Sequence, residues 1–147
     1  MRKTLNAGLL MGFILTFLSW MATLLSGALP MGWLGGLTSG VSVLTLAGWF
    51  WLGWRLATRE DGPILGAFAG IVSGLVYGLL VGVVQAVFVG PAASGQAATF
   101  SEGLLGSLGA IVGSTFLGGV IGLAGGSAGR LYRRQARARS LDDVKGD

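Results

Sequence analysis

Long apolar stretches alternate with short polar breaks along this chain. Two stretches, 4–54 and 103–129, contain no charged residue, and a third apolar stretch lies between them. A transmembrane helix needs about 20 mainly apolar residues, so the first stretch is long enough for two helices and a turn. The pattern predicts four membrane-spanning helices. They cover residues 5–25, 33–54, 64–89 and 103–129.

Glycine and proline mark the breaks between these helices. The segments 26–32 and 90–96 each contain both residue types, and Pro63 opens the third helix. Such residues favour a chain reversal, and proline suits the first turn of a helix. The sequence therefore predicts an all-α integral membrane domain in 1–129, with four transmembrane helices arranged as two antiparallel hairpins. A basic cytoplasmic tail, 130–147, follows it.

The N-terminus has some features of a signal peptide. Met1-Arg2-Lys3 precedes an apolar run that ends near the small residues Ser26-Gly27-Ala28. A cleaved signal peptide has an apolar core of about 7 to 15 residues. The run in this chain is about 20 residues long, which is the length of a full span. We therefore expect the first helix to be retained.

The distribution of charge predicts the orientation of the chain. Only 11% of the residues are charged and 52% are hydrophobic, whereas about 25% of the residues in an average soluble domain are charged. With four spans, all ten Lys and Arg residues fall on one side and only Glu102 falls on the other. Basic residues mark the cytoplasmic side. The sequence predicts a multi-pass protein of the inner (plasma) membrane with both termini in the cytoplasm.

Basic residues are most concentrated after the last helix. The tail arginines are Arg130, Arg133, Arg134, Arg137 and Arg139. Each basic residue beside an anionic membrane surface contributes about 1 kcal/mol, so we expect these arginines to contact anionic lipid headgroups or a cytoplasmic partner. Basic residues that flank apolar helices do not form a patch on a folded surface, and we expect no nucleic acid as a partner.

Tryptophans lie close to the charged end of the second helix. Trp49, Trp51 and Trp54 immediately precede Arg55. Tryptophan is enriched at membrane–water interfaces, where its ring is half apolar and its N–H finds a polar partner. We expect these three side chains to lie in an interfacial belt.

Glycines recur at a spacing of four in the third and fourth helices. One row consists of Gly66, Gly70, Gly74, Gly78 and Gly82, and a second of Gly109, Gly113, Gly118, Gly122 and Gly126. Such small-xxx-small rows, or glycine zippers, let helix backbones approach closely in lipid. Successive glycines at this spacing are rotated by about 40° around the helix axis, because four residues exceed one helical turn. The row therefore implies either a right-handed crossing with one neighbouring helix or contacts with two different neighbouring helices. The plainer alternative is that glycine is common in membrane helices.

The two halves of the chain resemble each other in pattern. Residues 7–13 align with 69–75, and 32–37 align with 103–108, with glycines in matching places. Two hairpins of the same orientation would be parallel repeats related by an axis along the membrane normal. Glycine- and leucine-rich helices also align this well through composition alone, so duplication and shared composition both account for the similarity.

Few residues have chemistry that a reaction needs. The chain has no cysteine and no histidine, which excludes disulfides, thiolate metal sites and histidine-based catalytic triads. We therefore predict no catalytic residue, no metal and no cofactor. No ionisable carboxylate or amine lies within the predicted spans, which argues against a proton path. Tyr77 and Gln85 are the candidates to line a polar path, although bonding to a neighbouring helix is the more common role of such residues.

In span number, length and glycine spacing, the chain resembles small, glycine-rich, four-helix prokaryotic membrane proteins that are grouped into families of unknown function. That resemblance implies no activity. The residues favour a non-enzymatic helix-packing or assembly protein, as a homo-oligomer or a small accessory subunit of a larger membrane complex. The alternative is a passive channel or small-solute transporter.

The orientation can be tested with accessible tags. Tags at the N-terminus, near Gly62 and at the C-terminus are expected to react with cytoplasmic reagents, because basic residues flank all three positions. A tag near Ser94 is expected to react only from outside. A C-terminal tag that is labelled from outside and protected inside would overturn the assignment.

Overall fold

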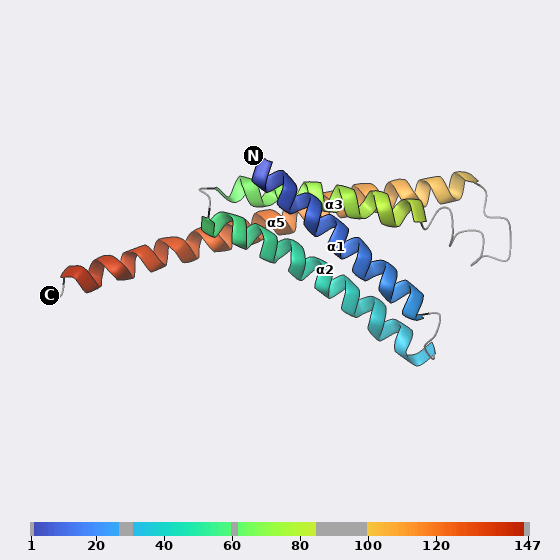
Figure 1. The fold of residues 1–147 in the computed structure, drawn as a ribbon, viewed down its shortest axis with the longest axis horizontal. Helices are drawn as coiled ribbons and strands as arrows, with labels where there is room; N and C mark the ends of the chain where they lie inside the picture. The colour runs from blue at the N-terminus through green and yellow to red at the C-terminus, as the bar shows by residue number, and fades with distance from the viewer. Residues whose placement is uncertain (1, 27–30, 60–61, 85–99, 146–147) are drawn as a thin grey trace.

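The computed structural model describes all residues except 1, 27–30, 60–61, 85–99 and 146–147. The described residues form four helices (Figure 1). They are α1 (Arg2–Ser26), α2 (Met31–Arg59), α3 (Pro63–Val84) and α5 (Phe100–Lys145). The prediction of an all-helical chain with four helices is confirmed. The predicted end of the third helix, 85–89, and the polar candidate Gln85 lie outside the described residues.

The last helix continues through most of the predicted tail. α5 contains 46 residues and ends at Lys145, whereas the apolar pattern alone ends at 129. No glycine or proline occurs from Arg130 to Lys145, and Arg, Ala, Gln and Leu are good helix formers. The helix therefore does not stop where the apolar residues stop. Its C-terminal part projects beyond the other helices (Figure 1).

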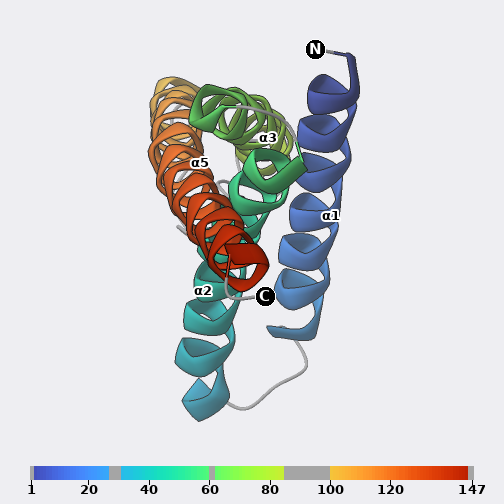
Figure 2. The same cartoon turned by 90° about the vertical axis from the view of Figure 1, so that its left-hand side faces the viewer.

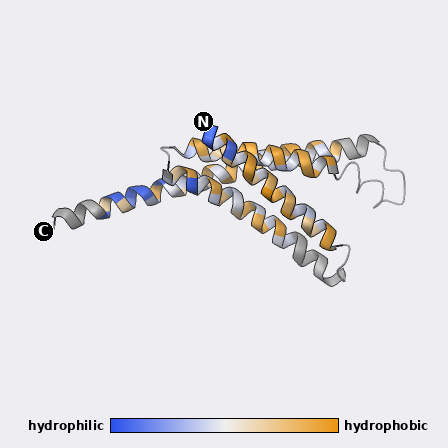
Figure 3. Ribbon diagram, viewed as in Figure 1, coloured by the Kyte–Doolittle hydropathy of each residue, from blue (hydrophilic) through white to orange (hydrophobic). Residues whose placement is uncertain are grey.

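Three helical segments are long and apolar enough to cross a membrane. Among the described residues these are Arg2–Leu25, Pro63–Val83 and Leu105–Arg139. The segments found among the described residues include none from α2. Figure 3 shows the hydrophilic colour at the N-terminal end of α1, near the C-terminal end of α2 and along the last part of α5. These three places lie toward the same end of the molecule.

The helices pack as two crossing pairs. α3 and α5 lie side by side and make the most extensive contact, while α1 packs mainly on α3 and α2 packs mainly on α5. The contact between α1 and α2 is smaller than either of these. α1 and α2 slant across the other pair and diverge from it at one end, which Figures 1 and 2 show from two directions. The predicted first hairpin is therefore held more by α3 and α5 than by its own two helices.

Much of the molecular surface is apolar. Leu24 near the end of α1 is 73% exposed, and Val43 on α2 is 64% exposed. The buried hydrophobic side chains of the described residues are few, and they include Leu15, Trp49 and Leu52. A contiguous apolar surface of this kind is unusual for a soluble monomer and is typical of a surface that contacts membrane or protein.

Candidate helix-packing interface

All five glycines of the α3 row face α5. A Cβ atom added to Gly70 would overlap the carbonyl oxygen of Gly118, and one added to Gly74 would overlap the carbonyl oxygen of Ser114. The atoms in the way are backbone atoms, which cannot rotate aside as a side chain can. Glycine at these positions therefore permits direct contact between two helix backbones.

The contact is reciprocal along the antiparallel pair. A Cβ added to Gly118 would overlap the carbonyl oxygen of Gly70, and one added to Gly122 would overlap that of Gly66. From Gly66 to Gly74, each step of four residues along α3 is matched by a step of four back along α5. The two rows of small residues therefore interlock within one chain, and α5 faces the whole α3 row.

The α5 row differs from the predicted one in its N-terminal half. A Cβ added to Gly109 or Gly113 would meet nothing within 4 Å, so these glycines lie away from the contact. Ser114 and Ser107 face α3 instead, opposite Gly74 and Gly82. A spacing of four that starts from Gly118 leads to residue 114 rather than 113. Counting serine as a small residue would have identified this register in the sequence.

The two serines also bond across the interface. The Ser114 hydroxyl donates to the Gly74 carbonyl oxygen at 2.8 Å, and the Ser107 hydroxyl donates to the Gly82 carbonyl oxygen at 2.9 Å. Hydrogen bonds of this kind between membrane helices contribute about 0.6 kcal/mol on average, with a maximum near 1.7. Small size and a polar hydroxyl thus act together at both positions.

The C-terminal part of the α5 row contacts α3 and also α2. A Cβ added to Gly126 would lie 2.9 Å from the Pro63 carbonyl oxygen at the start of α3. On the α2 side, a Cβ on Gly53 would overlap the Gly122 carbonyl oxygen, and one on Gly125 would overlap the Phe50 carbonyl oxygen. Three helix backbones therefore approach one another around Gly122.

α1 contacts α3 through two glycines of its own. A Cβ on Gly8 would lie 2.8 Å from the Ala69 carbonyl oxygen, and one on Gly12 would lie 2.8 Å from the Val76 Cβ. These two residues are spaced by four, as in the predicted rows. Two glycines make too short a row to stand out in a chain with 28 of them.

A buried polar contact joins α2 to α3. The Trp49 indole Nε1 donates to the Ser73 hydroxyl oxygen at 3.1 Å, and both residues are buried, at 2% and 0% exposed. The Tyr77 ring meets the Trp49 ring edge to face, with centroids 6.0 Å apart and an interplanar angle of 89°. Tyr77 thus lies beside the helix-packing interface.

The interfacial-belt prediction stays a prediction for all three tryptophans, but the Trp49 side chain is buried and its N–H is bonded inside the protein. Trp51 is 51% exposed, and the Arg55 guanidinium carbon lies 5.0 Å from its ring centroid. Trp54 packs against Tyr132 of α5, with ring centroids 5.5 Å apart. Three neighbouring tryptophans therefore have three different environments.

The tail arginines lie on α5 just beyond this aromatic contact. Arg130, Arg134 and Arg139 are exposed, and so is Arg137, while Arg133 is partly covered. Arg130, Arg133, Arg134 and Arg137 surround a hollow of about 220 Å³. Their spacing places these four on one side of the helix, and Arg139 lies outside the hollow.

The described residues contain no group of three or more acidic, cysteine or histidine side chains that is arranged to hold a metal ion. Searches of protein-family models, curated proteins and solved structures find no match to this chain.

The α3–α5 contact can be tested with one added methyl group. Gly74→Ala is expected to destabilise the protein by roughly 1 to 3 kcal/mol, because the methyl group overlaps backbone that cannot move without separating the helices. Thermal unfolding in a single detergent, followed by circular dichroism and light scattering, measures the change.

Gly113→Ala is the matched control for this substitution. It makes the same chemical change in α5 where a Cβ meets open space, so stability should change by about 0.5 kcal/mol or less. Equal melting temperatures for the two variants would show that the α3 and α5 backbones do not touch at Gly74.

The Trp49–Ser73 hydrogen bond can be measured by a double-mutant cycle. Trp49→Phe and Ser73→Ala are expected to be coupled by about 0.6 to 1.7 kcal/mol, because each removes one partner of a buried bond. Trp51→Phe with Ser73→Ala is the control pair, since Trp51 is exposed and should show no coupling. Additive effects of Trp49→Phe and Ser73→Ala would contradict the bond.

Proposed function

We propose that this protein spans the inner membrane four times, with both termini in the cytoplasm, and acts as a non-enzymatic assembly protein. It works as a homo-oligomer or as a small accessory subunit of a larger membrane complex. Three apolar helices and the gathering of hydrophilic residues toward one end of the molecule support this placement (Figure 3).

α2 is the fourth span in this proposal. It has no charged residue before Arg55, and two polar side chains in its membrane-spanning part bond inside the protein. The Thr45 hydroxyl donates to the Val41 carbonyl oxygen at 2.8 Å, and Trp49 donates to Ser73. Polar groups that are bonded internally cost little to place in lipid. In this proposal α2 therefore crosses the bilayer in contact with α5.

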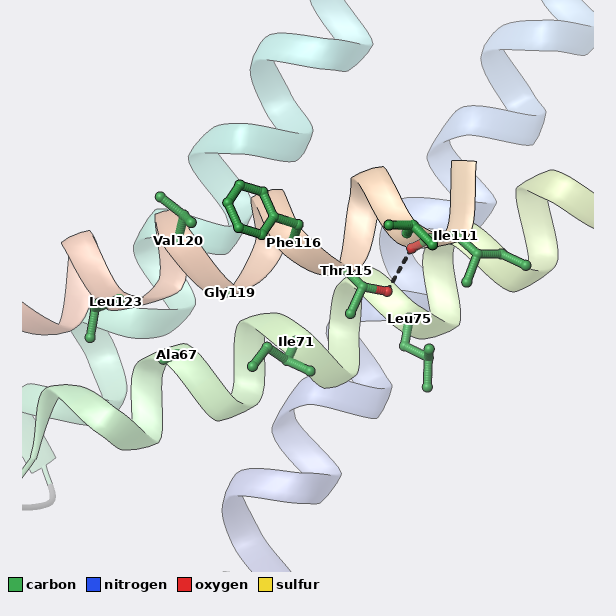
Figure 4. Close-up of a pocket in the computed structure, with 10 residues that line it drawn as sticks. Ala67, Ile71, Leu75, Ile111, Thr115, Phe116, Gly119, Val120 and Leu123 are labelled. Atoms are coloured by element: carbon green, nitrogen blue, oxygen red, sulfur yellow. Dashed lines mark hydrogen bonds between the residues drawn. The ribbon is translucent and has the colours of Figure 1, made fainter. Parts of the chain in front are cut away.

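An apolar groove on the far side of α3 and α5 is the observation that carries the assembly proposal. The glycine rows are occupied within the chain, so a partner needs a different surface. The groove has a volume of about 630 Å³ and lies on the side of α3 opposite its contact with α1 (Figure 4). Its lining includes Ile71 and Leu75 of α3 and Phe116 and Val120 of α5.

The shape and chemistry of the groove suit the side chains of another helix. The small residues Ala67 and Gly119 lie among larger side chains, so the surface has both depressions and ridges. In ridges-into-grooves packing, the side chains of a second helix fill such depressions. Phe116 is 69% exposed at the rim. The polar side chain in the lining, Thr115, donates to the Ile111 carbonyl oxygen at 2.6 Å, as the dashed line in Figure 4 shows. Because the Thr115 hydroxyl is already bonded, the groove presents an apolar surface, which suits a helix better than a polar solute.

The arginine tail orients and anchors the assembly. Anionic lipid headgroups are its main partners in this proposal, since the tail follows the apolar part of α5 directly. In this placement, Tyr132 and Trp54 lie at the membrane–water interface, where aromatic side chains are enriched. Each is within one helical turn of an arginine on its own helix.

The assembly proposal can be tested by cross-linking in the membrane. A benzophenone amino acid in place of Phe116 is expected to form a cross-link to a protein, either a second copy or another membrane subunit, because the groove is a protein contact. The cross-linked mass, measured after purification, separates these two cases.

Leu24→benzophenone provides the control, because Leu24 is as exposed as Phe116 but lies at the far end of α1. It is expected to label lipid or detergent. If the probe at position 116 also labels only lipid, the groove is a lipid-facing surface and the assembly proposal fails.

A further inference from the structure

A second cavity, distinct from the α3–α5 groove, lies between α1 and α2. It has a volume of about 620 Å³ and is formed by the N-terminal half of α1 and the C-terminal half of α2. Lys3 and Arg55 line it together with apolar residues that include Leu10, Met11 and Ile14. It occurs where the contact between the two helices is smaller than their contacts with α3 and α5.

The lining changes from charged to apolar along the cavity. Lys3 lies in the first turn of α1, and Ile14 lies 11 residues later, which corresponds to about 16 Å along the helix axis. α2 runs in the opposite direction, so its C-terminal end lies beside the N-terminal end of α1 (Figure 1). Arg55, near that end of α2, therefore lines the cavity together with Lys3. The cavity therefore has two cations at one end and an apolar body that extends toward the middle of the helices.

The Arg55 side chain is held at the edge of this cavity. Its guanidinium carbon lies 5.0 Å from the centroid of the Trp51 ring, within the range of a cation–π contact. Trp51 also lines the cavity. No acidic residue is among the described residues that line it. The charged end is thus arranged to receive an anion.

We propose that this cavity binds one anionic phospholipid. Its phosphate lies between Lys3 and Arg55, and one acyl chain follows Leu10, Met11 and Ile14. Arginine and lysine are the usual ligands of phosphate groups, and basic pockets between membrane helices on the cytoplasmic side bind anionic headgroups. A soluble anion would leave the apolar body empty. An acyl chain of about 16 Å fills it and enters the site from the bilayer.

The lipid would occupy the gap that the small contact between α1 and α2 leaves, and so join the two helices. This inference rests on the membrane placement proposed above, but it does not depend on assembly through the α3–α5 groove. The two proposals can therefore fail separately.

Native mass spectrometry of the full chain in mild detergent tests the site. The protein is titrated with phosphatidylglycerol and with phosphatidylcholine that carry the same acyl chains. One phosphatidylglycerol is expected to bind about tenfold more tightly than phosphatidylcholine, or tighter still, because only the former is anionic. Equal affinity for the two lipids would overturn the proposal, and so would equal competition by oleate, which would assign the site to a fatty acid.

Removing the two cations tests the charged end. Lys3→Gln with Arg55→Gln is expected to weaken phosphatidylglycerol binding about 25-fold, since each basic residue contributes about fivefold. Arg2→Gln with Arg139→Gln is the matched control. It removes the same amount of positive charge at residues that do not line the cavity and should change the affinity by less than about twofold. An equal loss in both variants would show that binding depends only on net charge.

Filling the apolar body tests the other end without any change of charge. Ala7 lines the cavity, so Ala7→Phe is expected to reduce binding about tenfold or more. Val43→Phe on the exposed face of α2 is the control and should bind as the original protein does. Circular dichroism verifies that both variants are folded. Undiminished binding by folded Ala7→Phe would rule out an acyl chain in this cavity.

Discussion

Direct contact between the backbones of α3 and α5 determines how the other helices are placed. The two helices approach so closely that a methyl group on Gly70 or Gly74 would overlap a carbonyl oxygen of α5. In the proposed membrane placement, apolar side chains gain little by leaving lipid, so dispersion contacts and hydrogen bonds between helices hold the pair together. Small residues increase the dispersion contacts because they let the backbones approach closely, and Ser107 and Ser114 supply the hydrogen bonds.

The positions of α1 and α2 follow from this central pair. α1 contacts α3 through Gly8 and Gly12, on the side away from the apolar groove, and α2 contacts α5 through Gly53. The Trp49–Ser73 bond then connects α2 to α3. Because each outer helix is held mainly by a helix of the other pair, α1 and α2 do not need to pack tightly on each other. The lipid-sized cavity between them is a consequence of that arrangement.

Local features of the sequence predicted part of this structure. Charge-free stretches and the glycine and proline breaks indicated the helices, since each depends only on neighbouring residues. The glycine spacing in α3 indicated a close contact, but its partner row on α5 required counting Ser114 in place of Gly113. The burial of Trp49 was not predictable, because it depends on Ser73, which is 24 residues away on another helix. Long-range pairings of this kind leave no pattern in one sequence.

The continuity of α5 has a mechanical consequence. One uninterrupted helix contains both the residues that interlock with α3 and the arginines at the far end, so the tail acts as a lever attached to the packed core. About 16 residues project past Gly129, a length of about 24 Å. A tilt of about 10° between α5 and α3 would therefore move the tip of the lever by about 4 Å. Any contact that fixes the position of the tail also sets the angle at which the two central helices cross.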